Sequence, residues 1–246
     1  MILSFKLLGI NPFFQAYTQA DWLGRAIFLG LVLLSILTWV LLIYKIHYTR
    51  TARRTALAFY KRFQKERHHP LAMAENASTS PYQNLYRTMK EYALELLKKN
   101  QHFSSRAEEE GVYLSPSDID LIGNHLMTQV TAEAQRLEAH VYILRMIISL
   151  APFLGLLGTV WGILTTFSDP QALSGGASNY AVLGGMSLAL VTTVLGLLDA
   201  IPALVGYHYI RNHIQEFETE MESFSNEMLG SVELQYRQVD LRHPSP

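Results

Sequence analysis

The sequence predicts an all-α membrane protein with three transmembrane helices, of which the second and third extend into the cytoplasm as a helical bundle. Hydrophobic residues make up 49% of the 246 residues and charged residues only 17%, below the roughly 25% typical of soluble domains. Charge is also unevenly placed. Uncharged runs of 19, 23 and 29 residues separate Arg25 from Lys45, Arg145 from Asp169, and Asp169 from Asp199. An apolar run of about 20 residues crosses a bilayer as a helix because the helix satisfies every backbone polar group internally.

Composition also excludes several classes of function. The net charge is −1, so no global basic excess favours nucleic-acid binding. The chain has no cysteine, which removes disulfides, thiol catalysis and thiolate metal sites. Its nine histidines are scattered, and no Ser/His/Asp arrangement is visible. We therefore expect no enzyme activity, no cofactor and no metal site.

The distribution of basic residues predicts how the chain crosses the membrane. Positive residues stay on the cytoplasmic side. The segment before the first span has only Lys6 and Arg25 against Asp21, whereas the segment after it has eight basic residues against one acid, Glu66. These eight are Lys45, Arg50, Arg53, Arg54, Lys61, Arg62, Lys65 and Arg67. The N-terminus is thus predicted to be periplasmic and the C-terminus cytoplasmic. Lys6 interrupts the apolar start and no small-residue cleavage site follows, so the first span is expected to be retained as an anchor.

This topology divides the chain into seven segments. They are an external N-terminal segment (1–21), a first transmembrane helix (22–44), a cytoplasmic helical region (45–140), a second transmembrane helix (141–167), a periplasmic loop with turn-forming residues (168–179), a third transmembrane helix (180–210), and a cytoplasmic C-terminal helix and tail (211–246).

Proline and capping residues place the cytoplasmic helices. A helix over 52–67 is expected to end before Pro70, and Ser80-Pro81 starts a second helix. Ser115 followed by Pro116 reads as the N-cap and first turn of a third. From there the helical pattern continues without a breaker into the second span. The third span is similarly predicted to continue as a polar helix toward Gly230.

Three glycines mark one face of the second span. Gly155, Gly158 and Gly162 are spaced by three and four residues, which makes a flat strip where another helix can approach closely. Helix packing is the plain interpretation, because no Gly-Lys-Ser/Thr follows to form a phosphate-binding loop. Between subunits, such a strip would favour a homo-oligomer that Gly158→Leu should weaken. Pro152 is expected to kink the helix or loosen its first turn.

Polar side chains in the second and third spans are the candidate functional groups. Thr159 either bonds back to a carbonyl one turn earlier or lines a hydrated path. Thr192 and Asp199 are seven residues apart and therefore share a helix face. An ionisable residue in a membrane helix is a functional hypothesis by default. About 20 residues from Asn179, at about 1.5 Å each, nevertheless place Asp199 near the cytoplasmic interface, where its carboxylate could snorkel to water.

Three segments resemble the ExbB/TolQ branch of the MotA/TolQ/ExbB proton-channel family. The stretch 151–167, APFLGLLGTVWGILTTF, is similar to the most recognisable block of that branch. The stretch 196–203, GLLDAIPA, which contains Gly196 and Pro202, resembles its third-helix signature. The stretch 34–45, LSILTWVLLIYK, is similar to its first helix. Helix order and the large loop between the first two helices also match.

The resemblance implies a function and a set of partners. Such proteins form homo-oligomeric rings, typically pentamers, in the bacterial inner membrane, around the single transmembrane helices of an ExbD- or TolR-like partner. Proton flow past an aspartate of that partner drives motion that reaches a periplasm-spanning TonB- or TolA-like protein. The family's two channel threonines correspond to Thr159 and Thr193 here. Similarity around 82–92 and in the long C-terminal helix favours the Tol type slightly.

One departure from the family pattern leaves alternatives open. The branch normally has a glutamate where this chain has Leu188, and a proline where it has Gly184. Asp199 stands instead where a small apolar residue is usual, and 11 residues at about 100° each place it within about 20° of the face of Leu188. Asp199 is then either a relocated carboxylate of the proton path or a sign that this chain conducts differently. The alternatives are a MotA-like stator subunit, which usually has four spans, a non-conducting scaffold, and a membrane-bound enzyme, for which no catalytic constellation is visible.

Overall fold

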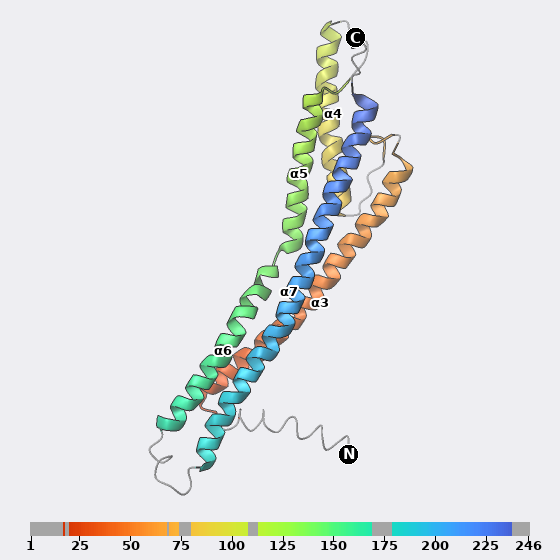
Figure 1. Cartoon of the computed structure of the whole chain (residues 1–246). Helices are drawn as coiled ribbons and strands as arrows, with labels where there is room; N and C mark the ends of the chain where they lie inside the picture. Colours follow the sequence, from red (N-terminus) through yellow and green to blue (C-terminus); the bar gives the residue numbers. More distant parts are fainter. Residues whose placement is uncertain are drawn as a thin grey trace, which may run out of the picture. The chain divides into compact units, whose positions relative to one another are not determined.

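The computed structural model describes residue 17 and residues 20–67, 69–73, 80–107, 113–168 and 179–237. In these ranges the chain forms five α-helices and no strand (Figure 1). They are α3 (Trp22–Lys65), α4 (Pro81–Ala107), α5 (Pro116–Glu138), α6 (Val141–Ser168) and α7 (Asn179–Tyr236). Within the described ranges, three helices are long and apolar enough to cross a membrane, namely α3, α6 and α7. The predicted fold class is therefore confirmed.

The chain divides into two compact units that share α3 and α7. The transmembrane unit contains the residues up to Ile46 and His140–Ile210, and so holds the apolar part of α3, all of α6 and the first part of α7. The polar unit contains His47–Ala139 and the residues from Arg211 onward. It holds the basic end of α3, all of α4 and α5, and the acidic part of α7.

In the transmembrane unit, α3 and α7 run parallel in a fixed register. A Cβ atom added to Gly24 would lie 2.7 Å from Cδ2 of Leu188, and one added to Gly206 would overlap Leu42. Leu188 and Gly206 each come 164 positions after their partners in α3, as expected for two parallel helices of the same rise. This register decides which α7 side chains face α3.

Aromatic packing forms the core of the polar unit. The ring of Tyr82 stacks on Phe224 at 4.3 Å and nearly parallel to it, while Phe63 meets Phe224 edge-on at 5.3 Å. Burial, and to a lesser degree the negative charge of Glu220, raises the pKa of Tyr82 to about 12. Arg53 pairs with Glu220 beside this core, so basic residues of α3 meet acidic residues of α7 within the unit.

Capping chemistry determines where α5 begins, as predicted. The Ser115 Oγ accepts a hydrogen bond from the Asp118 backbone N–H at 3.2 Å, and Asp118 Oδ2 accepts from the Ser115 N–H at 2.9 Å. The Asn100 amide of α4 donates to the same carboxylate at 2.9 Å. Partial burial favours the neutral acid, but these hydrogen bonds to the charged form outweigh it, and the pKa of Asp118 lies below its usual value.

The predicted unbroken helix from Pro116 into the second span is wrong. The chain leaves helical geometry at Ala139 and His140, and His140 has a φ of 66°. Histidine is one of the few non-glycine residues enriched in this left-handed region, which ends helices in the manner of a C-terminal glycine. A search for Gly or Pro therefore misses the break, which falls at the boundary between the two units. Conversely, Gly230 lies inside α7, which continues to Tyr236.

The buried side chain of Glu133 joins α4 to α5 through a network of hydrogen bonds. Its side chain is 6% exposed, and Oε1 accepts from Asn84 Nδ2 at 2.9 Å, Gln129 Nε2 at 3.0 Å and Arg136 Nη1 at 2.9 Å. A buried carboxylate is tolerated only when its lone pairs are occupied in this way. The network is therefore both stabilising and sensitive to the loss of its centre.

We expect Glu133→Ala to destabilise the polar unit by on the order of 1–3 kcal/mol, because the half-buried amides of Asn84 and Gln129 would lose their acceptor. Thermal unfolding of the purified full chain in detergent, followed by circular dichroism, measures this. Glu138→Ala is the matched control, since Glu138 is an exposed glutamate of the same helix. Equal melting of the two variants would contradict the structural role of the network.

Candidate functional site

The glycine strip of α6 packs against α7 of the same chain, and Figure 1 shows the two helices side by side. A Cβ added to Gly155 would lie 2.9 Å from the Thr192 carbonyl oxygen, and one on Gly162 would lie 2.8 Å from that of Gly185. At Gly158 it would overlap the side chain of Thr192. The strip thus lets two backbones approach within one subunit, where the sequence pattern also allowed a contact between subunits.

Small residues of α7 complete this α6–α7 seam. A Cβ on Gly196 would lie 2.5 Å from the Ala151 carbonyl oxygen and 3.2 Å from the Cα of Gly155. Pro152 and Pro202 lie half-buried inside α6 and α7, and both helices continue through them. The absence of side chains at the seam exposes backbone carbonyl oxygens of α6 to polar groups of α7.

Two threonine hydroxyls of α7 lie within hydrogen-bond distance of one of these carbonyl oxygens, that of Gly155. Thr193 Oγ1 donates to the Gly155 carbonyl oxygen across the seam at 3.2 Å. Thr192 Oγ1 lies 3.5 Å from the same oxygen and bonds mainly within its own helix, to Ala189 O at 2.9 Å. Thr192 is fully buried and Thr193 half-buried. Thr193 is therefore the hydroxyl that joins the two spans while keeping some access.

Thr159 has a different arrangement. Its Oγ1 donates to the Leu156 carbonyl oxygen of its own helix at 2.7 Å, which is the ordinary bond of a membrane threonine. The side chain is half-buried. Thr159 and Thr193 lie on facing helices of the seam, but no hydrogen bond between them is among those of the described residues.

The Asp199 carboxyl reaches α3, although Asp199 lies within about 20° of the direction of Thr192 on α7, and Thr192 packs against Gly158 of α6. The residue is only 3% exposed, its carboxyl group hydrogen-bonds to the side chain of Ser35, and its Oδ2 atom has no hydrogen-bond partner. Leu188, on nearly the same face of α7, packs beside Gly24 of α3. The carboxyl is thus not extended toward solvent, as snorkelling would require.

Sequence reasoning missed Ser35 as the partner of Asp199. The two residues are 164 positions apart, the same offset that pairs Gly24 with Leu188. Nothing in a single sequence reveals that register. Their proximity is therefore a property of the tertiary structure.

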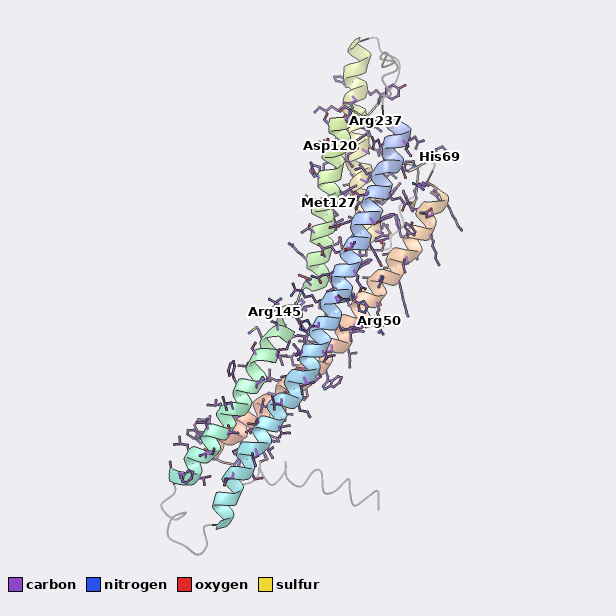
Figure 2. The ribbon with its side chains drawn as sticks, in the orientation of Figure 1. Arg50, His69, Asp120, Met127, Arg145 and Arg237 are labelled. Carbon is purple, nitrogen blue, oxygen red and sulfur yellow. The ribbon has the colours of Figure 1, made fainter. Side chains whose placement is uncertain are left out.

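Two further polar contacts of the transmembrane unit were also missed. Asp21 accepts a hydrogen bond from the Gly24 backbone N–H at 2.9 Å and another from Trp161 Nε1 at 2.7 Å, so it caps α3 and ties it to α6. Near the start of α6 (Figure 2), Arg145 donates to the Tyr207 phenol oxygen at 2.7 Å and lies over its ring. Both contacts join helices of the unit near the ends of the apolar spans.

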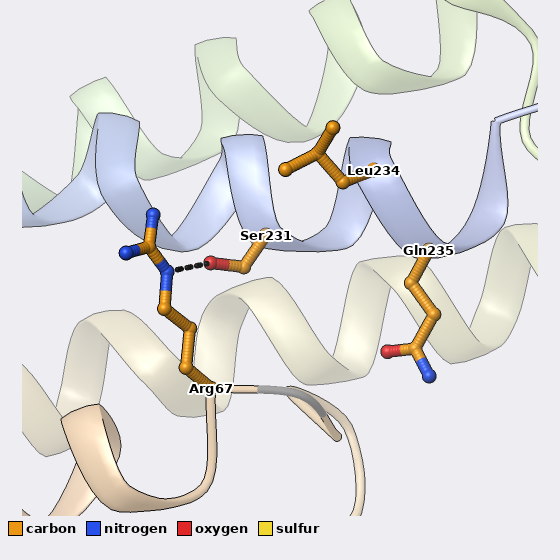
Figure 3. A pocket seen from close by; sticks show the side chains of 4 residues that line it. All are labelled: Arg67, Ser231, Leu234 and Gln235. Carbon is orange, nitrogen blue, oxygen red and sulfur yellow. Dashed lines mark hydrogen bonds between the residues drawn. The ribbon is translucent and has the colours of Figure 1, made fainter.

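A shallow surface hollow lies in the polar unit (Figure 3). Arg67, Ser231, Leu234 and Gln235 line it. Arg67 Nε donates to Ser231 Oγ at 3.4 Å, and the guanidinium lies 3.7 Å from Glu227. The hollow contains none of the predicted site residues. In the part of the chain that the structure describes, no group of three or more acidic or histidine side chains is arranged to hold a metal ion.

The transmembrane unit thus consists of three apolar helices, two of which pack closely through glycines and are joined by a threonine hydroxyl. The family model described as the MotA/TolQ/ExbB proton channel family matches residues 89–223, and the chain belongs to this family. Relatives named ExbB and TolQ place it in the ExbB/TolQ branch, a group of multi-pass inner-membrane proteins.

Three relatives illustrate the similarity. "Biopolymer transport protein ExbB" of Pseudomonas putida is 28% identical over 87% of this chain and 61% of its own length. The Salmonella typhimurium protein of the same name is 25% identical over 92% of this chain and 86% of its own. "Tol-Pal system protein TolQ" of Pseudomonas aeruginosa is 27% identical over 78% and 79%. The chain thus spans about three fifths of the length of the Pseudomonas putida protein that it matches.

We expect Gly158→Leu to disrupt the α6–α7 seam, because the new side chain would overlap Thr192 where the helices leave no room. The yield of monodisperse protein in detergent should fall several-fold. Gly30→Leu is the control, since a Cβ on Gly30 meets nothing within 4 Å in the chain. If both variants purify like the wild type, the seam tolerates bulk and the packing described above is wrong.

Proposed function

We propose that this chain is the proton-channel subunit of an inner-membrane complex that converts proton-motive force into mechanical work on a periplasm-spanning TonB- or TolA-like protein. The subunit would assemble as a homo-oligomer, a pentamer by resemblance, around an ExbD- or TolR-like partner with a single membrane span. Family membership and relatives named for biopolymer transport and for the Tol-Pal system support this proposal. It covers both systems, because relatives of both names match at similar identity.

The observation that carries the proposal is the hydroxyl of Thr193 at the seam. It donates to the Gly155 carbonyl oxygen at 3.2 Å, so its lone pairs stay free to accept from an acid on a partner helix. A hydroxyl that donates and accepts at once can pass a proton along a hydrogen-bonded chain. Thr159, on the facing helix, is the second member of the proposed path. Asp199 is the third candidate, because it is the only acidic residue in 22–44, 141–167 and 180–210.

Conduction through this site requires no cofactor or covalent step of the chain's own. The energy comes from proton entry on one side of the membrane and exit on the other, and a charge crossing 100 mV supplies about 2.3 kcal/mol. The acid that travels with the proton would belong to the partner, as the family resemblance implies. The described residues contribute the hydroxyl, the backbone acceptors and the close helix contact that exclude bulk water.

Thr193→Val tests the role of the hydroxyl. Valine keeps the volume but neither donates nor accepts, so we expect energised function to fall at least tenfold while the complex still assembles. The readout is resistance to detergents and large antibiotics for a Tol-type role, or receptor-dependent uptake for a TonB-type role, in a strain that lacks the chromosomal copy.

Thr193→Ser is the matched control, because it keeps the hydroxyl and should retain most of the function. Co-purification of the partner subunits verifies assembly of each variant. Full activity of an assembled Thr193→Val complex would overturn the proton-path role of this residue.

The proposed orientation has its own test. The chain has no cysteine, so a single introduced cysteine reports its side of the membrane without background. In intact cells we expect Glu91→Cys, on an exposed position of α4, to be protected from an impermeant thiol reagent. Ser168→Cys, exposed at the other end of α6, should be labelled once the outer membrane is permeabilised. The reverse pattern would invert the topology.

A further inference from the structure

The carboxyl of Asp199 is buried and takes no part in the hydrogen bond between Thr193 and Gly155. It is 3% exposed and lies on the face of α7 that packs against α3, whereas Thr193 faces α6. The single polar group that reaches it among the described side chains is Ser35. Its second oxygen, Oδ2, has no hydrogen-bond partner. An ionised carboxylate in this position would keep a buried, unpaired charge, which is among the costliest arrangements in a protein interior.

Among the described residues, no cation of the surrounding helices lies close enough to compensate this charge. On α3, the nearest charged residues are Arg25 and Lys45, each ten positions from Ser35 and therefore about 15 Å away along the helix. On α6, the guanidinium of Arg145 is held by the phenol of Tyr207. Tyr207 is eight residues beyond Asp199 on α7, about 12 Å along the axis.

The hydroxyl of Thr38, the next polar side chain on this side of α3, does not donate to the Asp199 carboxyl. Thr38 is 1% exposed and follows Ser35 by three residues, on the same side of the helix. Its Oγ1 donates to the Leu34 carbonyl oxygen at 2.9 Å, within its own helix. Ser35 is therefore left as the one hydroxyl that serves the carboxyl.

We propose that Ser35 and Asp199 form a proton-binding site inside the subunit, between α3 and α7, in which burial keeps the Asp199 carboxyl in its neutral, protonated form and Ser35 is its hydrogen-bond partner. The acid O–H on Oδ1 donates to Ser35 Oγ, and Oδ2 remains as the carbonyl oxygen, whose lack of a partner costs far less than that of a carboxylate oxygen. Release of the proton requires water or a new donor to enter between α3 and α7. The site therefore links protonation to the packing of the first and third spans.

The Ser35–Asp199 contact is distinct from the hydrogen bond between Thr193 and Gly155. Its meaning as part of a proton path rests on the proposed function, but its existence does not, because proton binding is a property of the isolated chain. Proton binding is tested on the purified chain without partner subunits. A failure of energised function in Thr193→Val assays and a failure of proton binding at Asp199 are thus independent results.

A hydrophobic carbodiimide detects a protonated carboxyl in an apolar environment. The acid adds across one C=N bond: its proton goes to nitrogen, its oxygen bonds to the central carbon, and the acyl group then shifts to nitrogen as a stable N-acylurea. The step needs no oxidant or reductant, and an ionised carboxylate does not undergo it. Dicyclohexylcarbodiimide is the hydrophobic reagent. A water-soluble carbodiimide, used with a free amine, is the comparison and modifies carboxyl groups that are accessible to water.

We expect the hydrophobic reagent to modify Asp199 near neutral pH, seen by mass spectrometry as a peptide carrying one added reagent molecule, and Asp199→Asn to lose the adduct. The water-soluble reagent should modify exposed Asp120 on α5 and leave Asp199 unmodified. An Asp199 that stays unmodified by the hydrophobic reagent between about pH 5 and pH 9 in the folded chain would overturn the proposal. So would equal modification by both reagents, since that means an open, hydrated carboxylate.

Ser35→Ala examines the other half of the site. Ser35 accepts from the neutral acid and donates to the ionised form, and its hydrogen bond to the charged form is the stronger of the two. Its loss therefore favours the neutral acid, and the pH of half-maximal modification should move upward. Ser35→Thr keeps the hydroxyl and should behave as the wild type. Thr38→Ala, a change of similar size one turn away, should leave that pH unaltered. An unaltered pH in Ser35→Ala would exclude Ser35 from the site and overturn the proposal as stated.

Discussion

The close approach of α6 and α7 is the constraint on which the rest of the transmembrane unit depends. Lipid tails are as apolar as leucine, so membrane helices gain little by burying large side chains against one another and associate through tight packing instead. That packing is made possible by Gly155, Gly158 and Gly162 of α6, and Gly196 of α7 packs against Gly155. Because glycine has no side chain to cover the backbone, the Gly155 carbonyl oxygen can accept a hydrogen bond from Thr193 of the facing helix.

The seam also decides what the other face of α7 can do. Thr193 and Gly196 face α6, and Leu188 and Asp199, which contact α3, lie about 60° to 140° from them around the axis of α7. One helix therefore serves two interfaces of opposite character. The α6–α7 interface carries hydroxyls and backbone acceptors, and the α3–α7 interface carries a single buried acid with one hydroxyl partner. Both interfaces lie within the transmembrane unit.

The polar unit is held by different physics. Its core is aromatic, with Tyr82 and Phe224 stacked at 4.3 Å, and its helices are joined by ion pairs and by the hydrogen bonds of Glu133. Burial of large rings drives association only where water is the alternative environment, as it is here and is not between membrane spans. The left-handed turn at His140 separates α5, in this unit, from α6 in the other.

By itself the sequence determined the helical fold class, the three apolar spans and the starts of α4 and α5, because hydrophobic length and capping residues act locally. It also identified Asp199 and the glycine strip as unusual features of the spans, and the family resemblance added Thr193. Only the tertiary structure decided that the strip packs within one chain, that Thr193 reaches Gly155, and that Asp199 meets Ser35. Those contacts depend on the register and rotation of helices far apart in sequence, and helical periodicity gives a residue's face but not the neighbour which that face will meet.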